Sequence, residues 1–268
     1  MRLFVTGLGG YLGSAVAAAA LEAQHDVAGS VRSRAAPPGT RAVTVDVRDE
    51  RAVMEAIAAT APDAVVHTAY VREGDAWPVN VDGSAFVARA ARAAGARLVH
   101  LSSDVVFAGD LGRPLREDDT LGPINAYGES KAAAEAAVLA ACPGAVLVRT
   151  SLIYGGAAPS SYELAAVDPA QTFYDDEIRC PVVAGDLATA LIELAALPDV
   201  GGPLHVAGPD AVTRLEFAQL IAAAGGGDPA KVRGGQRPLG RAGDLRLDCS
   251  LARSLLAVRL RGVHEVLG

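Results

Sequence analysis

The sequence predicts an α/β fold in which a doubly wound parallel sheet is followed by a small, discontinuous C-terminal lobe. Over residues 1–150, short apolar runs alternate with Ala-rich stretches that are long enough for helices. Such alternation, with helices of about 10–15 residues between the strands, is typical of βαβ units joined by right-handed crossovers. Beyond residue 150 the alternation weakens, so a second and smaller lobe is expected there.

The individual elements follow from apolar runs, helical periodicity and turn residues. Within residues 79–94, Phe86, Val87 and Ala90 recur at helical spacing, and Gly95 stands just past the end as a cap. Residues 155–180 are rich in Gly and Pro and are predicted to be loop. The predicted strands are 3–6, 27–31, 42–47, 64–68, 97–101, 145–149 and 203–207, and the predicted helices are 12–24, 50–59, 79–94, 126–141, 186–196 and 215–224.

The composition is that of a packed globular protein. Of the 268 residues, 51% are hydrophobic and 21% charged, and no run reaches the ~20 apolar residues needed to span a bilayer. The net charge of -7 and the pI of 5.2 argue against nucleic acid or an anionic membrane as a partner. We expect no signal peptide, because Met1 leads directly into a strand and a glycine turn. Three widely spaced cysteines indicate neither a disulfide framework nor a zinc site, and the expected compartment is the cytoplasm.

A glycine-rich turn joins the first expected strand to the first expected helix. Gly7, Gly10 and Gly13 stand three residues apart. In a dinucleotide site, such glycines allow a tight turn that brings the backbone close to the pyrophosphate, and the N-terminus of the following helix supplies free N–H groups. The spacing is a variant of the common G-x-G-x-x-G, and no Gly-Lys-Ser/Thr indicates a P-loop. We therefore predict a Rossmann-type dinucleotide site that includes Thr6, Gly7, Gly9, Gly10, Tyr11, Leu12 and Gly13.

The residues at the end of the second expected strand indicate which dinucleotide cofactor the protein binds. NAD sites usually place a carboxylate there to bind the ribose 2′-hydroxyl, whereas this strand ends in Ser30 and Arg32, and Asp26 lies at its beginning. The planar guanidinium of Arg32 suits a 2′-phosphate, and Arg34 is a further candidate. The predicted cofactor is NADP(H).

A Tyr-x-x-x-Lys motif predicts the chemistry. Tyr127 and Lys131 lie at i and i+4 in an expected helix, on one face and about 6 Å apart along the axis. A nearby ammonium lowers the pKa of a phenol, so Lys131 would tune Tyr127 for proton exchange with a carbonyl or alcohol and would also hold the nicotinamide ribose. Ser103 lies just past the strand 97–101, at the sheet edge where ligands bind, and would polarise the substrate oxygen. Together these residues predict hydride transfer to or from a carbonyl carbon.

These motifs resemble the extended branch of the short-chain dehydrogenase/reductase superfamily over nearly the whole chain. Within that branch the pattern is most similar to the dTDP-4-dehydrorhamnose reductase group, through the stretches 101–107, 123–128 and 148–151. The weaker alternation beyond residue 150 predicts a dinucleotide-binding domain of residues 1–150, to which 181–204 return, and a substrate-binding lobe of 151–180 and 205–268.

The resemblance also implies site residues beyond the glycine turn. Asp46 and Val47 would contact adenine, and a segment after the fourth strand would lie beside the cofactor. The further implied cofactor residues are Thr68, Ala69, Tyr70, Asn80, Leu101, Ser102, Tyr127, Lys131 and Ser151. The implied substrate residues are Ser103, Asp104, Val105, Tyr127, Leu152 and Arg179.

Two departures from that group concern the substrate. Val105 stands where the group usually has Tyr, and Leu152 where it usually has Trp; these aromatics shape the sugar pocket. Val105 also follows Asp104 where sugar-nucleotide dehydratases carry Glu, which disfavours dehydration. Because residues 155–180 look short for holding a nucleotide-sugar, the expected substrate is either a 4-keto-deoxysugar nucleotide or a smaller ketone.

Several other residues are weighed as site candidates. His67 and His100 are expected to be packed structural side chains, Asp104 either binds substrate or caps the next turn, and Glu117 has a site role by resemblance. No cluster has metal-ligand spacing, so no metal is predicted. Two other functions stay open: a non-catalytic NADP-binding regulatory subunit, and an epimerase that retains NAD. A homodimer through helices 79–94 and 126–141 is also open.

Overall fold

The computed structural model describes residues 1–74 and 76–268. A seven-stranded sheet forms its centre, in the order β11-β6-β5-β4-β1-β2-β3, and every neighbouring pair is parallel. Its strands are β1 (Arg2–Thr6), β2 (Asp26–Val31), β3 (Arg41–Thr44), β4 (Ala64–His67), β5 (Arg97–Ser103), β6 (Val146–Thr150) and β11 (Gly202–His205). This sheet confirms the predicted α/β fold.

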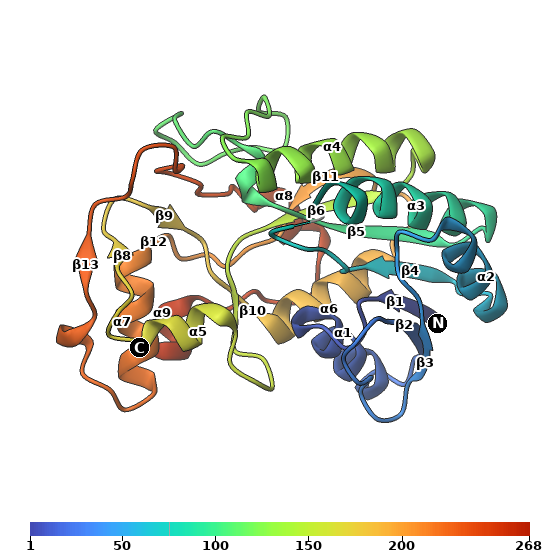
Figure 1. The fold of residues 1–268 in the computed structure, drawn as a ribbon, viewed down its shortest axis with the longest axis horizontal. Helices are drawn as coiled ribbons and strands as arrows, with labels where there is room; N and C mark the ends of the chain where they lie inside the picture. Colours follow the sequence, from blue (N-terminus) through green and yellow to red (C-terminus); the bar gives the residue numbers. More distant parts are fainter. Residues whose placement is uncertain (75) are drawn as a thin grey trace.

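Helices cover both faces of the sheet (Figure 1). One face carries α1 (Tyr11–Glu22) and α6 (Ala184–Ala195), whose apolar side chains form one core with β1, β4 and β5. The other carries α2 (Glu50–Thr60), α3 (Gly83–Ala93) and α4 (Ala126–Ala141), which form a second core with the same sheet. The central strands β1, β4, β5 and β6 are thus buried on both sides, as their continuous apolar sequences require, whereas the edge strand β3 is exposed.

The carboxyl ends of five strands meet at one edge of the sheet. Thr6, the last residue of β1, pairs in register with Ser30 of β2 on one side and with His67 of β4 on the other. Ser103 at the end of β5 pairs with Thr150 at the end of β6. The strand order reverses where β1 lies between β2 and β4, and ligands of open parallel sheets bind at such a point.

Most of the remaining elements pack around a separate apolar cluster beside this edge, whereas Ala252 of α8 (Ser250–Leu255) belongs to the core between the sheet and α1 and α6 (Figure 1). The cluster includes Tyr154, Phe173, Phe217 and Val263. Its short strands pair as β10 with β7, β12 with β9, and β13 with β8. The elements are β7 (Ile153–Tyr154), α5 (Ser161–Ala166), β8 (Phe173–Tyr174), β9 (Ile178–Arg179), β10 (Val182–Val183), β12 (Val212–Thr213), α7 (Arg214–Ala224), η3 (Pro229–Lys231), β13 (Gly234–Gly235), α8 (Ser250–Leu255) and α9 (Val263–Leu267).

Three predicted elements were wrong in part. Residues 155–180 are not all loop, because a capping box between Ser160 and Glu163 starts α5. The helix predicted at 79–94 begins as the π-helix η1 (Pro78–Asp82) and continues as α3. The strand predicted at 42–47 ends at Thr44, because its partner β2 ends at Val31. Of the helices in the described residues, none is long and apolar enough to cross a membrane.

Candidate active site

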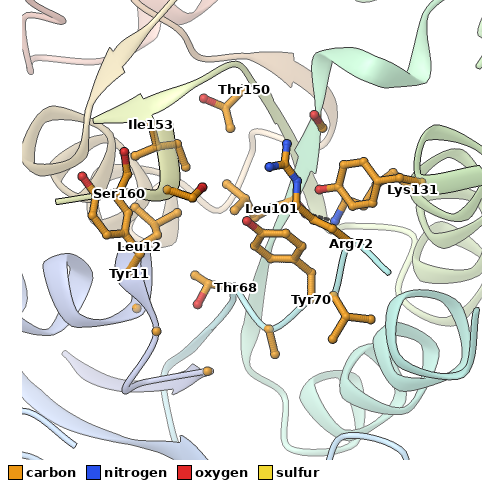
Figure 2. A pocket seen from close by; sticks show the side chains of 18 of the residues that line it. Tyr11, Leu12, Thr68, Tyr70, Arg72, Leu101, Lys131, Thr150, Ile153 and Ser160 are labelled. Atoms are coloured by element: carbon orange, nitrogen blue, oxygen red, sulfur yellow. Dashed lines mark hydrogen bonds between the residues drawn. The ribbon is translucent and has the colours of Figure 1, made fainter. Parts of the chain in front are cut away.

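A cavity of about 980 Å³ lies at the carboxyl edge of the sheet. Figure 2 shows Tyr11 and Leu12 of α1 near Ile153 and Ser160 on one side of it, and Tyr70, Arg72 and Lys131 on the other. The following predicted site residues line this cavity: Gly7, Gly9, Gly10, Tyr11, Leu12, Gly13, Ser30, Arg32, Asp46, Val47, Thr68, Ala69, Tyr70, Leu101, Ser102, Ser103, Asp104, Val105, Tyr127, Lys131, Ser151, Leu152 and Arg179.

The glycines of the first turn stand at positions that leave no room for a side chain. Gly7 has a φ of 69°, and its carbonyl oxygen accepts the backbone N–H of Gly10 at 2.8 Å. A Cβ on Gly13 would lie 2.2 Å from that same oxygen, and a Cβ on Gly9 would lie 2.6 Å from the carbonyl oxygen of Ala35. Gly10 caps α1 without a side chain, so the first N–H groups of the helix stay open to an anion. This backbone cradle fits the pyrophosphate of a dinucleotide.

Thr6 lies behind the cavity wall rather than in it. Its hydroxyl shares a hydrogen bond of 2.5 Å with Nδ1 of His67 and accepts the backbone N–H groups of Thr68 and Ala69 at 3.2 and 3.3 Å. Nε2 of His67 in turn lies 2.9 Å from the hydroxyl of Ser84. His67 is therefore a packed side chain, as expected, and Thr6 supports the segment that lines the cavity; its predicted cofactor contact stays a prediction.

Asn80 also supports the wall from behind. Its amide exchanges two hydrogen bonds of 2.9 Å with the backbone of Val71, and its Nδ2 donates to the hydroxyl of Ser130 at 2.9 Å. The Ser130 hydroxyl donates to the carbonyl of Tyr127 at 2.8 Å. Asn80 thus ties the segment after β4 to the first turn of α4, so the structure places it as a support and not as a cavity residue.

The corner expected to hold a 2′-phosphate is formed by the loop after β2. Arg32 and Arg34 both line the cavity there, together with Ser30 and with Ser33, which the sequence reasoning did not single out. Asp46 faces the same corner, but its carboxylate is bound by Arg48 at 2.6 Å, and this hydrogen bonding lowers the Asp46 pKa.

A glycine after Tyr127 places this tyrosine in the cavity. Asn125 caps α4 by accepting the backbone N–H of Gly128 at 2.8 Å. A Cβ on Gly128 would lie 2.4 Å from the carbonyl oxygen of Val105. The helix therefore starts in direct contact with η2 (Asp104–Val106), which brings Tyr127 close to the end of β5.

Lys131 is buried, with only 3% of its surface exposed. Its ammonium donates to the carbonyl oxygen of Leu101 at 2.6 Å and lies 5.8 Å from the ring centre of Tyr70. Burial lowers the pKa of Lys131 to about 8, and the nearby carboxylate of Glu135 opposes this effect.

Burial raises the pKa of Tyr127 well above its usual value, and Tyr70 adds to the increase. Arg72 opposes this increase. Desolvation dominates because it disfavours the charged phenolate. The expected tuning of Tyr127 by the ammonium of Lys131 stays a prediction.

Asp104 organises the substrate end of the cavity. One carboxylate oxygen accepts the hydroxyl of Ser103 at 3.1 Å, and the other accepts the hydroxyl of Ser151 at 2.7 Å and pairs with the Arg179 guanidinium at 3.0 Å. Asp104 also begins η2, for which Ser103 is the cap. The cap of this turn is therefore Ser103 and not Asp104, and substrate binding by Asp104 stays a prediction.

Among the side chains that line the cavity but were not found from the sequence are those of Arg72, Tyr162, Arg214 and Arg241. The capping box before α5 is the signal that locates Tyr162 on a helix. By contrast, Glu117 is not among the residues that line this cavity, and its carboxylate accepts the backbone N–H of His205 at 3.1 Å. No group of His, Cys, Asp and Glu in residues 1–74 and 76–268 is placed to hold a metal ion.

The parallel sheet, the backbone cradle and the Tyr–Lys pair over one cavity define a Rossmann-type α/β protein with a nucleotide-binding edge. The chain belongs to the RmlD substrate binding domain family, which it matches over residues 1–264. This membership confirms the resemblance drawn from the sequence.

Proteins with similar sequences and a similar solved structure agree with this family assignment. A dTDP-4-dehydrorhamnose reductase of Mycobacterium tuberculosis is 36% identical over 241 residues, which are 87% of this chain and 78% of the relative. A protein of Streptomyces antibioticus described as a probable dTDP-4,6-dihydroxy-2-methyloxan-3-one 4-ketoreductase is 33% identical, over 87% of this chain and 80% of its own. The crystal structure of a Bacillus anthracis dTDP-4-dehydrorhamnose reductase in complex with NADP has the same fold, with a TM-score of 0.84 at 22% identity over 99% of this chain and 96% of the other.

Proposed function

We propose that the protein is an NADP(H)-dependent oxidoreductase that reduces the keto group of a 4-keto-deoxysugar nucleotide. The observation that carries the proposal is that Ser103, Tyr127 and Lys131 line the same cavity as the glycine cradle. The names of two relatives, a dTDP-4-dehydrorhamnose reductase and a 4-ketoreductase of another dTDP-linked compound, support the reaction class.

Each polar side chain of the site has a part in the proposed reaction. NADPH, when bound, supplies the hydride. Tyr127 donates its phenolic proton to the carbonyl oxygen, and the Ser103 hydroxyl binds the same oxygen. Lys131 contributes a buried positive charge that favours the phenolate left on Tyr127. The Ser103 hydroxyl donates to Asp104 in the structure, so in the proposed reaction its proton turns from that carboxylate to the substrate oxygen.

The cofactor preference is proposed from the corner after β2. Arg32 and Arg34 line it, and a guanidinium binds a phosphate through two parallel hydrogen bonds. We also propose the division into a dinucleotide-binding domain of 1–150 with 181–204 and a lobe of 151–180 with 205–268. The separate apolar cluster around Phe217 supports the lobe, and the pairing of β11 with β6 supports the return of 202–205 to the sheet.

A fluorescence titration with NADPH and NADH tests the cofactor assignment. Wild-type protein is expected to bind NADPH at least about tenfold more tightly than NADH, a difference of about 1.4 kcal/mol. Arg32→Gln is expected to weaken NADPH binding and to leave NADH binding within about twofold, because only NADPH carries the 2′-phosphate. Tighter binding of NADH by the wild type contradicts the assignment and favours the epimerase.

A further inference from the structure

Arg72 lies between two tyrosines at the centre of the cavity. Its guanidinium carbon is 5.7 Å from the ring centre of Tyr127 and 5.1 Å from that of Tyr162, and its NH2 group donates a hydrogen bond to the Tyr162 hydroxyl. Arg72 belongs to the segment between β4 and η1, whereas Tyr162 belongs to α5. Tyr162 therefore anchors a cation over the ring of Tyr127 from the opposite side of the cavity.

Other groups act on Tyr127 from every side. Those with an electrostatic effect on its phenol are Tyr70 and Arg72 from the segment after β4, Asp104 from η2 and Tyr162 from α5. Asp104 and the two tyrosines disfavour the phenolate, whereas Arg72 favours it. Lys131, from the same helix as Tyr127, directs its ammonium to the carbonyl of Leu101.

The charge on Arg72 acts on the ionised form of the phenol. A phenolate ring carries more negative charge than a phenol ring, so a cation over its face binds the phenolate more strongly. When Tyr127 gives its proton to the substrate oxygen, the electron pair of the O–H bond stays on Tyr127 as a phenolate.

We propose that Arg72 is a positioning residue for this proton transfer, held over Tyr127 by Tyr162 so that the phenolate is stabilised as it forms. The proposal rests on the proposed function, in which Tyr127 is the proton donor. It assigns to Arg72 a part of the electrostatic task that the Tyr-x-x-x-Lys motif gives to Lys131 alone.

A pH–rate profile of the reverse reaction tests the proposal. Oxidation of the hydroxy-sugar nucleotide by NADP⁺ needs the phenolate, so the rate rises with pH as Tyr127 ionises. Arg72→Gln is expected to move this rise upward by about 0.5–1 pH unit, after allowance for solvent screening of an open side chain. At a fixed pH below the rise, the rate then falls about 3–10-fold and recovers at higher pH.

Two further variants separate charge from structure. Arg72→Lys keeps a cation and is expected to restore at least half of the shift. Arg214→Gln is the matched control, because Arg214 lies 4.6 Å from the Tyr162 ring centre and lines the same cavity, whereas the cation over the Tyr127 ring is Arg72. It is expected to leave the position of the rise unchanged, even if KM increases. A rate in Arg72→Gln that stays within about twofold of the wild type below the rise, or a loss that Arg72→Lys does not restore, overturns the proposal.

A second measurement needs no turnover. Tyrosines are replaced by a fluorinated tyrosine whose phenol ionises at lower pH, and the fluorine NMR signal of Tyr127 is assigned with Tyr127→Phe. The midpoint of its titration is expected to be higher in Arg72→Gln than in the unsubstituted protein, and equal midpoints refute the role of Arg72. Absence of turnover with any keto-sugar nucleotide, by contrast, refutes the proposed function and leaves this NMR comparison to decide on Arg72.

Discussion

Replacing Gly13 by Ala tests whether the close backbone contact in the glycine turn is needed. The new Cβ would lie 2.2 Å from the carbonyl oxygen of Gly7 and 2.9 Å from its carbonyl carbon, closer than the 3.0 Å that real Cβ atoms respect. Both atoms belong to backbone, so α1 has to move away from the turn by about 1 Å, in a core that is close-packed. Such overpacking costs about 1–3 kcal/mol, which lowers Tm by about 2–4 °C per kcal/mol at this chain length.

The same shift displaces the N–H groups of α1 from the expected pyrophosphate position. We therefore expect Gly13→Ala to weaken NADPH binding by at least about tenfold, measured by fluorescence titration. The matched control is Gly185→Ala near the start of α6, where a new Cβ meets nothing within 4 Å; it is expected to keep NADPH affinity and to raise stability slightly, because Ala favours a helix. If Gly13→Ala melts and binds NADPH like the wild type, the contact does not matter and the reasoning is refuted.

The remaining predictions concern buried charges. Because burial lowers the pKa of Lys131 to about 8, the unfolded state binds more protons between about pH 8 and pH 10.5, and this residue makes stability rise with pH in that window. Lys131→Met is expected to be inactive. Its free energy of unfolding, measured in urea, is expected to be about 1–3 kcal/mol higher than that of the wild type at pH 7, with a smaller gain near pH 10. An equal gain at both pH values speaks against a lowered pKa of Lys131. Glu135→Ala leaves Arg149, its partner at 2.8 Å, buried and unpaired and is expected to cost about 3–5 kcal/mol. Removing Glu55 from its exposed pair with Arg51 is expected to cost less than about 0.5 kcal/mol, and similar losses in the two variants contradict the reasoning.

The sheet and the cofactor cradle were predictable because local chemistry specifies them. The apolar runs that become β1, β4, β5 and β6 are buried on both faces, and their composition reflects this directly. The glycines of the first turn are needed for local backbone reasons, and the spacing of Tyr127 and Lys131 is fixed by the geometry of one helix. These residues reach one cavity because all of them lie at the carboxyl edge of a parallel sheet.

The parts that were not predictable depend on contacts between distant segments. No periodicity places Arg72 against Tyr162, since 90 residues separate them along the chain. Asn80 and Thr6 look like cofactor residues from their motifs, yet their hydrogen bonds turn them toward the segments behind the wall. Burial raises the pKa of Tyr127, and because burial depends on the whole fold, the Tyr-x-x-x-Lys motif alone does not predict this increase.

The most direct test of the central claim is NADPH oxidation with dTDP-4-dehydrorhamnose, comparing the wild type with Tyr127→Phe. The account predicts turnover by the wild type and a loss of at least about 100-fold in Tyr127→Phe, with NADPH affinity within about twofold of the wild type. Equal rates in the two proteins would show that Tyr127 is not the proton donor. NADPH binding without turnover of this or any other keto-sugar nucleotide would contradict the reductase and favour a regulatory, cofactor-binding subunit.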